Sequence, residues 1–449
     1  MQTYFGVSKQ LLRVFTWACL GMAGTANGST AAENPAANLS LSEQQLIAAV
    51  KENSGQAIAL LEQSVKINSG TMNHAGVRAV GQLFQAQLQQ LGFSTRWAEM
   101  PAAMQRAGHL IAEHEGAGQQ GKRVLLIGHL DTVFEADSKV ALWERHGDRI
   151  RGQGVSDMKG GDVVILEALR ALKKIGALDS ASIRVVFSGD EERAGSPLEI
   201  ARADLIAAAK QSDIALAFEN AIHGKDGKDT ATIGRRASGS FSLKVQGQQG
   251  HSAGVFGAHG YGAIYETARI LNSFREQLIE PDLTFNAGLM LGGSELSHDD
   301  TSSTGTAFGK NNVIPKSALV KGDLRYLSNA QRERTYAKMR AIVAQNLPGT
   351  SAEISFRETY PAMAPSAGNL AIFQRYSQAS QDAGLGSLEI IAPGLRGAGD
   401  IQFVAPYLDS LDGLGASGRG AHSPDEDMEL ASLERASIRA ALMIYRLTR

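Results

Sequence analysis

Three consecutive carboxylates lie in the segment 187–196, which reads FSGDEERAGS. Asp190, Glu191 and Glu192 come almost directly after 183–187 (IRVVF), an apolar and β-branched run that predicts a buried strand. Like charges repel one another, and desolvating charge at the end of a core strand costs free energy. Either this loop points into water, or a positive charge lies beside it.

Four more polar stretches contain residue types that bind metal ions. They are GHLDTV with His129 and Asp131, RGQGVSDMKGG with Asp157, AFEN with Glu219, and GAHSPDED with His422. Side chains alternate along an extended backbone, so His129 and Asp131 share one side, where the Asp can orient the imidazole. Two His and several carboxylates suit two divalent cations about 3.5 to 4 Å apart, with one carboxylate bridging them.

The segments between these stretches predict alternating strands and helices. Strands are expected at 124–127, 183–187 and 214–218, and helices at 42–64, 77–91 and 162–175. Ser42, with Gln45 three residues later, resembles a capping box at the start of the first helix. Strands separated by helices favour a mostly parallel sheet, whose ligands gather beyond the carboxyl ends of its strands. Such a sheet would bring the polar stretches together.

A different order of elements begins near residue 237. Strands at 240–245, 283–291, 317–326 and 352–356 and helices at 261–277 and 330–346 give the order βαββαβ, the split βαβ sandwich. We therefore predict an α/β protein whose catalytic domain has a mostly parallel sheet and carries an inserted βαββαβ, ferredoxin-like domain. The catalytic domain is expected at 33–236 and 359–449, and the inserted domain at 237–358.

The composition is typical of a globular protein. The chain has 449 residues, of which 43% are hydrophobic and 20% are charged. Its formal net charge of −2 provides no basic surface, so no nucleic-acid partner is expected. The single cysteine, Cys19, lies near the N-terminus. A metal site in the rest of the chain must therefore use His and carboxylate ligands.

The N-terminus has the layout of a secretory signal peptide, which we predict at 1–32. Lys9 and Arg13 precede the apolar stretch 14–26, and small residues follow it. The apolar stretch is too short to span a bilayer, and no stable membrane anchor is expected. A mildly apolar N-terminal helix is the alternative. With a signal peptide, the protein would be periplasmic or secreted.

Taken together and in this order, the polar stretches and the inserted domain resemble the M20 metallopeptidases, a family of dinuclear zinc hydrolases. The family includes glutamate carboxypeptidases, acetylornithine deacetylases and succinyl-diaminopimelate desuccinylases. The resemblance implies two bound zinc ions, for which cobalt or manganese could substitute. It implies that His129 and Glu219 bind one ion, Glu192 and His422 bind the other, Asp157 bridges both, and Asp131 orients His129. It also implies a cis peptide between Asp157 and Met158.

The same resemblance assigns residues that act on the substrate. Glu191 would be the general base. The inserted domain of these enzymes is a lid and dimerisation domain, in which His251 of QGHSAG would stabilise the oxyanion, often across a homodimer. Asn312 in NNVIP and Arg325 in DLRY would contact the substrate. For Arg325, a surface ion pair is the alternative.

The order of the motifs and the AFEN and DLRY contexts resemble the glutamate carboxypeptidase branch most. This branch implies a zinc-dependent exopeptidase, a metallocarboxypeptidase that hydrolyses a C-terminal peptide or amide bond and releases Glu or a similar amino acid. A metal-bound water would attack the carbonyl, with Glu191 as its general base. The expected substrate is a small peptide or an N-acyl amino acid.

Three departures from that branch concern substrate specificity, and one of them is Asn220, which follows Glu219 where Pro is frequent. Tyr360 precedes Pro361 where the branch has an Arg, and Ala398 replaces a glycine in the run RGAGDI at 396–401. Arg396 in this run could still pair with a substrate carboxylate. An N-acyl amino acid deacylase that uses the same dinuclear site is therefore the alternative function. A non-catalytic binding protein would require a lost ligand or base, and none is lost.

Overall fold

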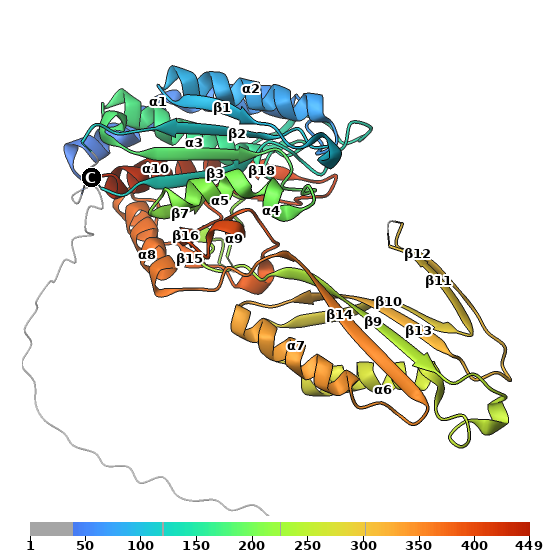
Figure 1. Ribbon diagram of the computed structural model, residues 1–449. Helices are drawn as coiled ribbons and strands as arrows, with labels where there is room; N and C mark the ends of the chain where they lie inside the picture. The colour runs from blue at the N-terminus through green and yellow to red at the C-terminus, as the bar shows by residue number, and fades with distance from the viewer. Residues whose placement is uncertain (1–38, 119–120, 225, 301) are drawn as a thin grey trace, which may run out of the picture.

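A computed structural model describes residues 39–449 except 119–120, 225 and 301. The predicted signal peptide at 1–32 lies outside these residues. Figure 1 shows a larger body of stacked helices and strands and an elongated smaller body that projects from it. The larger body contains a six-stranded sheet, and the smaller body contains a four-stranded sheet.

The six-stranded sheet is largely parallel. Its strands in spatial order are β1 (Ser94–Ala98), β2 (His109–His114), β6 (Ile183–Ser188), β3 (Val124–His129), β7 (Ile214–Ala217) and β16 (Asp409–Leu411). The strands from β6 to β16 run parallel, and β1 and β2 form an antiparallel edge. Because β3, β6 and β7 are buried along their whole length, they appear in the sequence as uninterrupted apolar runs. The predicted fold class is confirmed.

Helices cover both faces of this sheet. One face packs against α1 (Leu41–Val65), α2 (His74–Gln90), α3 (Lys159–Lys174), α8 (Ala367–Asp382) and α10 (Leu430–Leu447). The other face packs against α4 (Leu198–Ala201), α5 (Ala203–Lys210) and α9 (Ile401–Val404). Side chains of β3 alternate between these cores, because Leu126 belongs to the first and Leu125 to the second.

The cap of helix α1 lies two residues before the predicted cap. Ser40 accepts a hydrogen bond from the backbone N–H of Glu43, and the Glu43 carboxylate accepts one from the backbone N–H of Ser40. The predicted box of Ser42 and Gln45 is therefore wrong. Both serines precede an acidic or amide residue by three positions, but Glu43 also accepts a hydrogen bond of 2.7 Å from Arg446 in α10. This tertiary contact favours the earlier start.

The four-stranded sheet has the predicted βαββαβ order. Its strands in spatial order are β10 (Thr284–Gly293), β13 (Ser317–Arg325), β9 (Ser238–Gly247) and β14 (Thr350–Tyr360), and all neighbours are antiparallel. Helices α6 (Gly262–Gln277) and α7 (Asn329–Val343) pack on one face (Figure 1), where Phe241, Leu243 and Leu324 are buried. The strands alternate in burial because only this face is covered.

Several short elements were not predicted. A hairpin of β11 (Glu295–Asp299) and β12 (Thr304–Phe308) extends beyond β10. A small four-stranded sheet consists of β4 (Glu144–His146), β5 (Arg149–Arg151), β18 (Asp427–Glu429) and β17 (Gly418–Arg419). A two-stranded sheet pairs β8 (Thr230–Ala231) with β15 (Glu389–Ile390). Strand β12 is exposed at every residue, so burial leaves no apolar pattern in its sequence.

Two connecting segments join the smaller body to the larger one. Arg235 and Met363 exchange backbone hydrogen bonds of 2.9 and 3.0 Å, so the outgoing and returning segments lie side by side. Within the described residues, none of the helices combines the length and the apolarity needed to cross a membrane.

Candidate metal centre

Three parallel strands deliver polar residues to one edge of the six-stranded sheet. Strand β3 ends at His129, Glu192 follows β6, and Glu219 follows β7. Because β3 lies between β6 and β7, the carboxyl ends of these strands meet. Asp157 comes from the loop before α3, and His422 comes from the loop between β17 and β18. The five predicted ligands therefore arrive from five separate segments.

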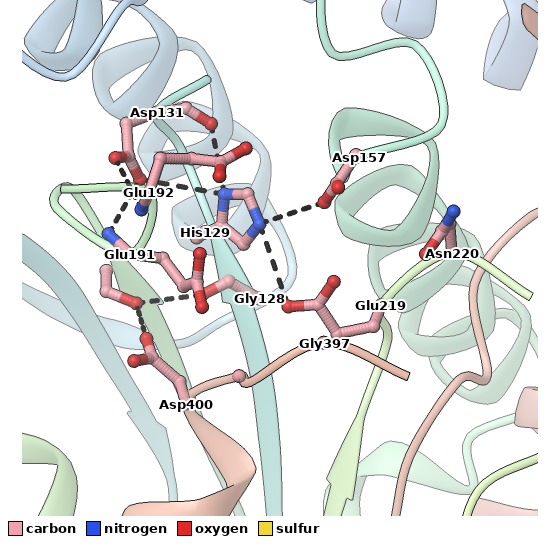
Figure 2. A network of polar contacts seen from close by, with 12 residues as sticks. Gly128, His129, Asp131, Asp157, Glu191, Glu192, Glu219, Asn220, Gly397 and Asp400 are labelled. Atoms are coloured by element: carbon pink, nitrogen blue, oxygen red, sulfur yellow. Dashed lines mark hydrogen bonds and ion pairs between the residues drawn. The ribbon is translucent and has the colours of Figure 1, made fainter. Parts of the chain in front are cut away.

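Asp157 lies between the two histidines. Its Oδ1 is 3.3 Å from His129 Nε2, and its Oδ2 is 3.2 Å from His422 Nε2. His129 Nε2 is also 3.7 Å from Glu219 Oε1, as Figure 2 shows, and His422 Nε2 is 3.1 Å from Glu192 Oε2. Each histidine thus belongs to a cluster of three potential ligands, and the two clusters share Asp157. A bridging carboxylate requires this arrangement.

The donor atoms of the cluster fit metal ions. His129 Nε2 and Glu192 Oε1 are buried and have no hydrogen-bond partner among the described residues. Buried polar atoms without a partner are costly, and a bound cation would satisfy both. Imidazole nitrogens with carboxylate oxygens form a ligand set that zinc accepts. The residues present are therefore suited to a pair of divalent metal ions.

Local backbone features allow these segments to converge. A Cβ atom at Gly161 would lie 1.8 Å from the carbonyl oxygen of Phe218, so glycine lets the first turn of α3 approach the residue before Glu219. The peptide between Asp157 and Met158 is cis, as expected. His422 has a φ of +65°, a left-handed conformation that is uncommon outside glycine and is found at functional sites.

The pKa values of the ligands indicate a need for positive charge. Burial and the neighbouring charge of Asp157 raise the pKa of Glu219 to about 8. Hydrogen bonds with Asp157 and Glu192 raise the pKa of His422 to about 11. Burial acts to raise the pKa of Asp157, but the neighbouring His129 and His422 imidazoles outweigh it and bring this pKa below its usual value. The site thus gathers carboxylates whose negative charge a bound cation would offset.

Glu191 lies beside the ligands and contacts them differently. Burial raises its pKa well above the ordinary value, His129 opposes this shift, and the charge of Glu219 adds to it. Its backbone is fixed, because its N–H donates to Asp131 at 3.0 Å and its carbonyl accepts from the Tyr360 hydroxyl at 2.9 Å. Its carboxylate accepts no hydrogen bond from the described residues. The side chain is therefore available to a substrate or a water.

The carboxylate of Asp131 holds the loop after β6. It accepts hydrogen bonds from the backbone N–H groups of Glu191 and Glu192 at 3.0 and 3.1 Å, and from the Thr71 hydroxyl at 2.7 Å. The Nδ1 atom of His129 is 3.6 Å from this carboxylate and bonds instead to the backbone carbonyl of Asp131 at 3.0 Å. Asp131 thus contacts the imidazole through its backbone and the two glutamates through its side chain.

Glu426 supports the loop that carries Asp157, and sequence analysis did not identify it. Its buried carboxylate accepts hydrogen bonds from the backbone N–H groups of Gly154, Ser156 and Asp157 at 3.2, 2.9 and 3.0 Å, and from the Ser156 hydroxyl at 3.1 Å. Glu426 belongs to the GAHSPDED motif, four residues after His422. The motif alone does not distinguish the buried Glu426 from Asp425, the exposed acidic residue that precedes it.

A buried ion-pair network lies behind Glu191. Arg202 donates to Asp190 at 2.5 Å and to Asp400 at 2.7 Å, and Ser188 also donates to Asp400. Figure 2 shows Asp400 below the loop of Glu191. The network connects this loop to the RGAGDI run. Sequence analysis missed it, since Arg202 lies in a helical segment without a motif.

The cluster opens into a cleft of about 800 Å³. Its walls include Glu191, Glu192 and His422 from the larger body, Arg325 from the smaller one, and Tyr360 at the end of β14. The predicted substrate residue Arg325 therefore lies in this cleft. Its Nε also donates to Asp323 at 3.0 Å, so it forms the ion pair considered as the alternative.

His251 and Asn312 lie elsewhere. Strand β9 starts at Ser238 in the cleft and runs for ten residues, about 30 Å, before the chain reaches His251. The backbone carbonyl of Asn312 accepts a hydrogen bond of 2.9 Å from the N–H of Ser252. Both predicted residues are exposed, and neither lines the cleft. The structure therefore does not bring them to the metal ligands of their own chain.

Arg396 lies beside Asn220, the residue that follows the predicted metal ligand Glu219. Its Nη2 donates to Asn220 at 3.2 Å, while its Nε is buried and has no partner among the described residues. Burial and the nearby charge of Arg235 lower its pKa to about 10, so the guanidinium remains charged at neutral pH. Because Asn220 follows Glu219, Arg396 places a positive charge near the metal ligands.

Comparison with known proteins adds a family and a fold. The chain matches the family model described as peptidase family M20/M25/M40 over residues 125–446. Carboxypeptidase G2 of Pseudomonas sp. (strain RS-16) is 27% identical over 406 residues, which cover 89% of this chain and 91% of that protein. A succinyl-diaminopimelate desuccinylase of Bradyrhizobium sp. (strain BTAi1 / ATCC BAA-1182) is 25% identical over 397 residues, which cover 84% and 95%.

A solved structure shares the fold. The YXEP protein of Bacillus subtilis, described as a dinuclear metal-binding peptidase of the M20 family, superposes with a TM-score of 0.61. The two chains are 16% identical, and the match covers 88% of this chain and 99% of the other. Fold, family and ligand geometry therefore agree that this is a metal-dependent hydrolase scaffold.

Proposed function

Because the chain belongs to peptidase family M20/M25/M40, we propose that it is a zinc-dependent carboxypeptidase that hydrolyses a C-terminal peptide or amide bond. The expected product is Glu or a similar amino acid, and the expected substrate is a small peptide or an N-acyl amino acid. The observation that carries this proposal is the position of Asp157, which directs one carboxylate oxygen at each of two histidines.

Five side chains would hold two zinc ions, for which cobalt or manganese could substitute. The proposed ligands are His129 and Glu219 for one ion, Glu192 and His422 for the other, and Asp157 between them. When bound, such ions polarise a substrate carbonyl and lower the pKa of a water. The unpartnered His129 Nε2 and Glu192 Oε1 support this assignment.

Glu191 would transfer the proton during hydrolysis. In the proposed reaction, its carboxylate takes a proton from the attacking water as the water oxygen bonds to the carbonyl carbon. Glu191 then gives this proton to the amine nitrogen as the C–N bond breaks. Its backbone is held by Asp131 and Tyr360, while its carboxylate is free of hydrogen bonds to the described residues.

Arg325 in the cleft and Arg396 beside Glu219 are proposed to bind substrate carboxylates.

We further propose that the smaller body, at 237–358, is a lid and forms a homodimer. Exposed apolar side chains gather on α6, β10 and the loop before α6: Phe256, Ile264, Tyr265 and Met290 are between 42% and 57% exposed. Strand β10 is also an edge strand, which can pair with another chain. In such a dimer, His251 would contact the oxyanion and Asn312 the substrate in the partner's cleft.

Export to the periplasm or the medium is proposed from the signal-peptide pattern at 1–32.

An N-acyl amino acid deacylase is the second candidate. Two observations favour it: a desuccinylase is among the relatives, and Tyr360 occupies the position where the carboxypeptidase branch has an Arg. The test compares zinc-loaded enzyme on dipeptides with free and amidated C-termini and on N-acyl amino acids. A carboxypeptidase requires the free C-terminus and prefers dipeptides, whereas a deacylase prefers the acyl substrates. No hydrolysis of either class, with or without added metal, would contradict both candidates.

A further inference from the structure

Within the described residues, helices cover only one face of the four-stranded sheet, and the other face is here called the open face. Side chains alternate along each strand, so residues that are opposite in register form rows across this face. Asn286 pairs with Asp323, Asp323 with Ser240, and Ser240 with Arg357. These four residues form a row of polar side chains on the open face, because their neighbours Phe241 and Leu324 belong to the core under α6 and α7.

A hollow of about 740 Å³ lies on the open face. It is lined by this row, by the next row of Lys321, Ser242 and Ser355, and by His298 and Asp300 beside the β11–β12 hairpin. Arg357 lines both this hollow and the cleft that contains Glu191. Strand β9 also contributes to both, with Ser240 in the hollow and Ser238 in the cleft. The cleft therefore continues as a groove along the open face.

Among the residues that the structure describes, Arg357 is the cation of this groove whose side chain has no partner. Lys321 pairs with Asp300 at 2.7 Å, and Arg325 pairs with Asp323 at 3.0 Å. Arg357 is exposed, and its side chain forms no hydrogen bond or ion pair with any residue that the structure describes. A guanidinium presents paired N–H donors that match a carboxylate, so Arg357 is available to bind one.

The position of Arg357 sets the length of the ligand. It lies three residues before Tyr360 on β14, and the Tyr360 hydroxyl contacts the carbonyl of Glu191. At about 3.3 Å per strand residue, Arg357 is about 10 Å along the strand from this point. We propose that the groove binds an extended acidic oligopeptide, whose carboxylate meets Arg357 about two or three residues from the scissile amide. This inference rests on the proposed peptidase function and specifies its substrate class.

The test uses matched tetrapeptides that differ at one residue, which is Asp, Asn or Lys at the second or third position from the scissile bond. For the wild-type zinc-loaded enzyme, we expect kcat/KM for the Asp peptide to exceed that for the Asn peptide by about tenfold, the value of one charge-assisted contact. Arg357→Ala should remove this preference, and Arg357→Glu should transfer it to the Lys peptide. The control Arg334→Ala changes an Arg that pairs with Glu280 on the helical side, and it should keep the preference.

Two outcomes would overturn the inference. One is that the wild-type enzyme has equal kcat/KM for the Asp, Asn and Lys peptides. The other is that both Arg357 variants keep the wild-type preference for the Asp peptide. In binding titrations to Glu191→Gln protein, C-terminally amidated peptides separate a side-chain carboxylate from the terminal one, because amidation removes only the charge of the terminal carboxylate. A binding titration of the Asp peptide to Glu191→Gln protein, with and without Arg357→Ala, gives a readout without turnover. If the wild-type enzyme hydrolyses none of the peptides while binding of the Asp peptide still depends on Arg357, the proposed function is contradicted, but peptide binding in the groove is supported.

Discussion

Glu191 and Glu192 are adjacent in the sequence but contact different groups. Glu192 places Oε2 3.1 Å from His422, whereas Glu191 groups with His129 and Glu192 but not with Asp157, and its carboxylate has no hydrogen bond to the described residues. The residue types alone could not separate a ligand from a base in this acidic run. The resemblance to M20 enzymes, now confirmed by the family match, supplied that distinction.

Replacing Glu191 by Gln should remove the proton acceptor and keep the metal ligands. We expect Glu191→Gln to lower turnover by at least about a thousandfold, because general-base catalysis and water activation are lost together. Zinc content, measured by elemental analysis, should stay at the wild-type value. Glu199→Gln, at the rim of the same cleft, is the matched control and should change turnover little. Near-normal turnover of Glu191→Gln would exclude Glu191 as the base.

Zinc affinity should fall as the pH falls. Without metal, the pKa of His422 is raised to about 11 by Asp157 and Glu192, and the pKa of Glu219 is raised to about 8 by burial. Metal ions bind the deprotonated ligands, so binding at neutral pH must release protons. Between pH 8 and pH 6, we expect the zinc association constant to drop by about tenfold or more per pH unit. Calorimetry in buffers of different ionisation enthalpy measures the released protons, and zero release would contradict these ligand assignments.

At the scale of elements, the loop before α3 depends on a distant carboxylate. Three backbone N–H groups of this loop point at Glu426, which lies beyond β17 in the chain. Without these hydrogen bonds, the loop would lose the contacts that fix Asp157 between the histidines. Glu426 is therefore a positioning residue for the proposed bridging ligand.

Glu426→Gln should weaken metal binding without removing any ligand. A Gln side chain has one acceptor oxygen, and its amide donors would face the N–H groups of the loop. We expect zinc affinity to fall about 10- to 100-fold, the usual effect of residues that support metal ligands. Asp425→Asn is the matched control, because Asp425 is exposed in the same loop and pairs with Arg151. Equal zinc affinity of the two variants in a calorimetric titration would show that Glu426 has no such role.

The elements that could be predicted are those whose burial leaves a pattern. Strands β3, β6 and β7 are apolar throughout because both faces are covered, and β9 and β13 alternate because one face is covered. The β11–β12 hairpin leaves no such pattern, and the start of α1 was misplaced because two serines satisfy the same capping rule. Contacts such as Arg202 with Asp400 join residues about two hundred positions apart, and no local spacing encodes them.

At the scale of the whole molecule, the proposed site is incomplete in one chain. His251 and Asn312 lie at the far end of β9 from the cleft, and apolar residues of α6 and β10 are exposed nearby. Ile264 contacts β10, since a Cβ atom at Gly292 would lie 2.8 Å from its Cγ1, so these residues form one surface. A second copy on this surface is the simplest way to complete the site.

Mixing two inactive variants tests this dimer. If His251 acts in the partner's site, a dimer of one Glu191→Gln chain and one His251→Ala chain contains one intact site and one site with both changes. Coexpression of the two variants should then restore about a quarter of the wild-type activity, given random pairing of the chains. Each variant alone is the control. No recovery in a sample that light scattering shows to be dimeric would place His251 outside the partner's site.

The central claim is that Asp157 bridges two metal ions. The most direct measurement is anomalous diffraction at the zinc absorption edge from crystals of the zinc-loaded protein. The account predicts two peaks, one beside each oxygen of Asp157, with His129 and Glu219 at one peak and His422 and Glu192 at the other. A single peak, or peaks that do not touch Asp157, would contradict it.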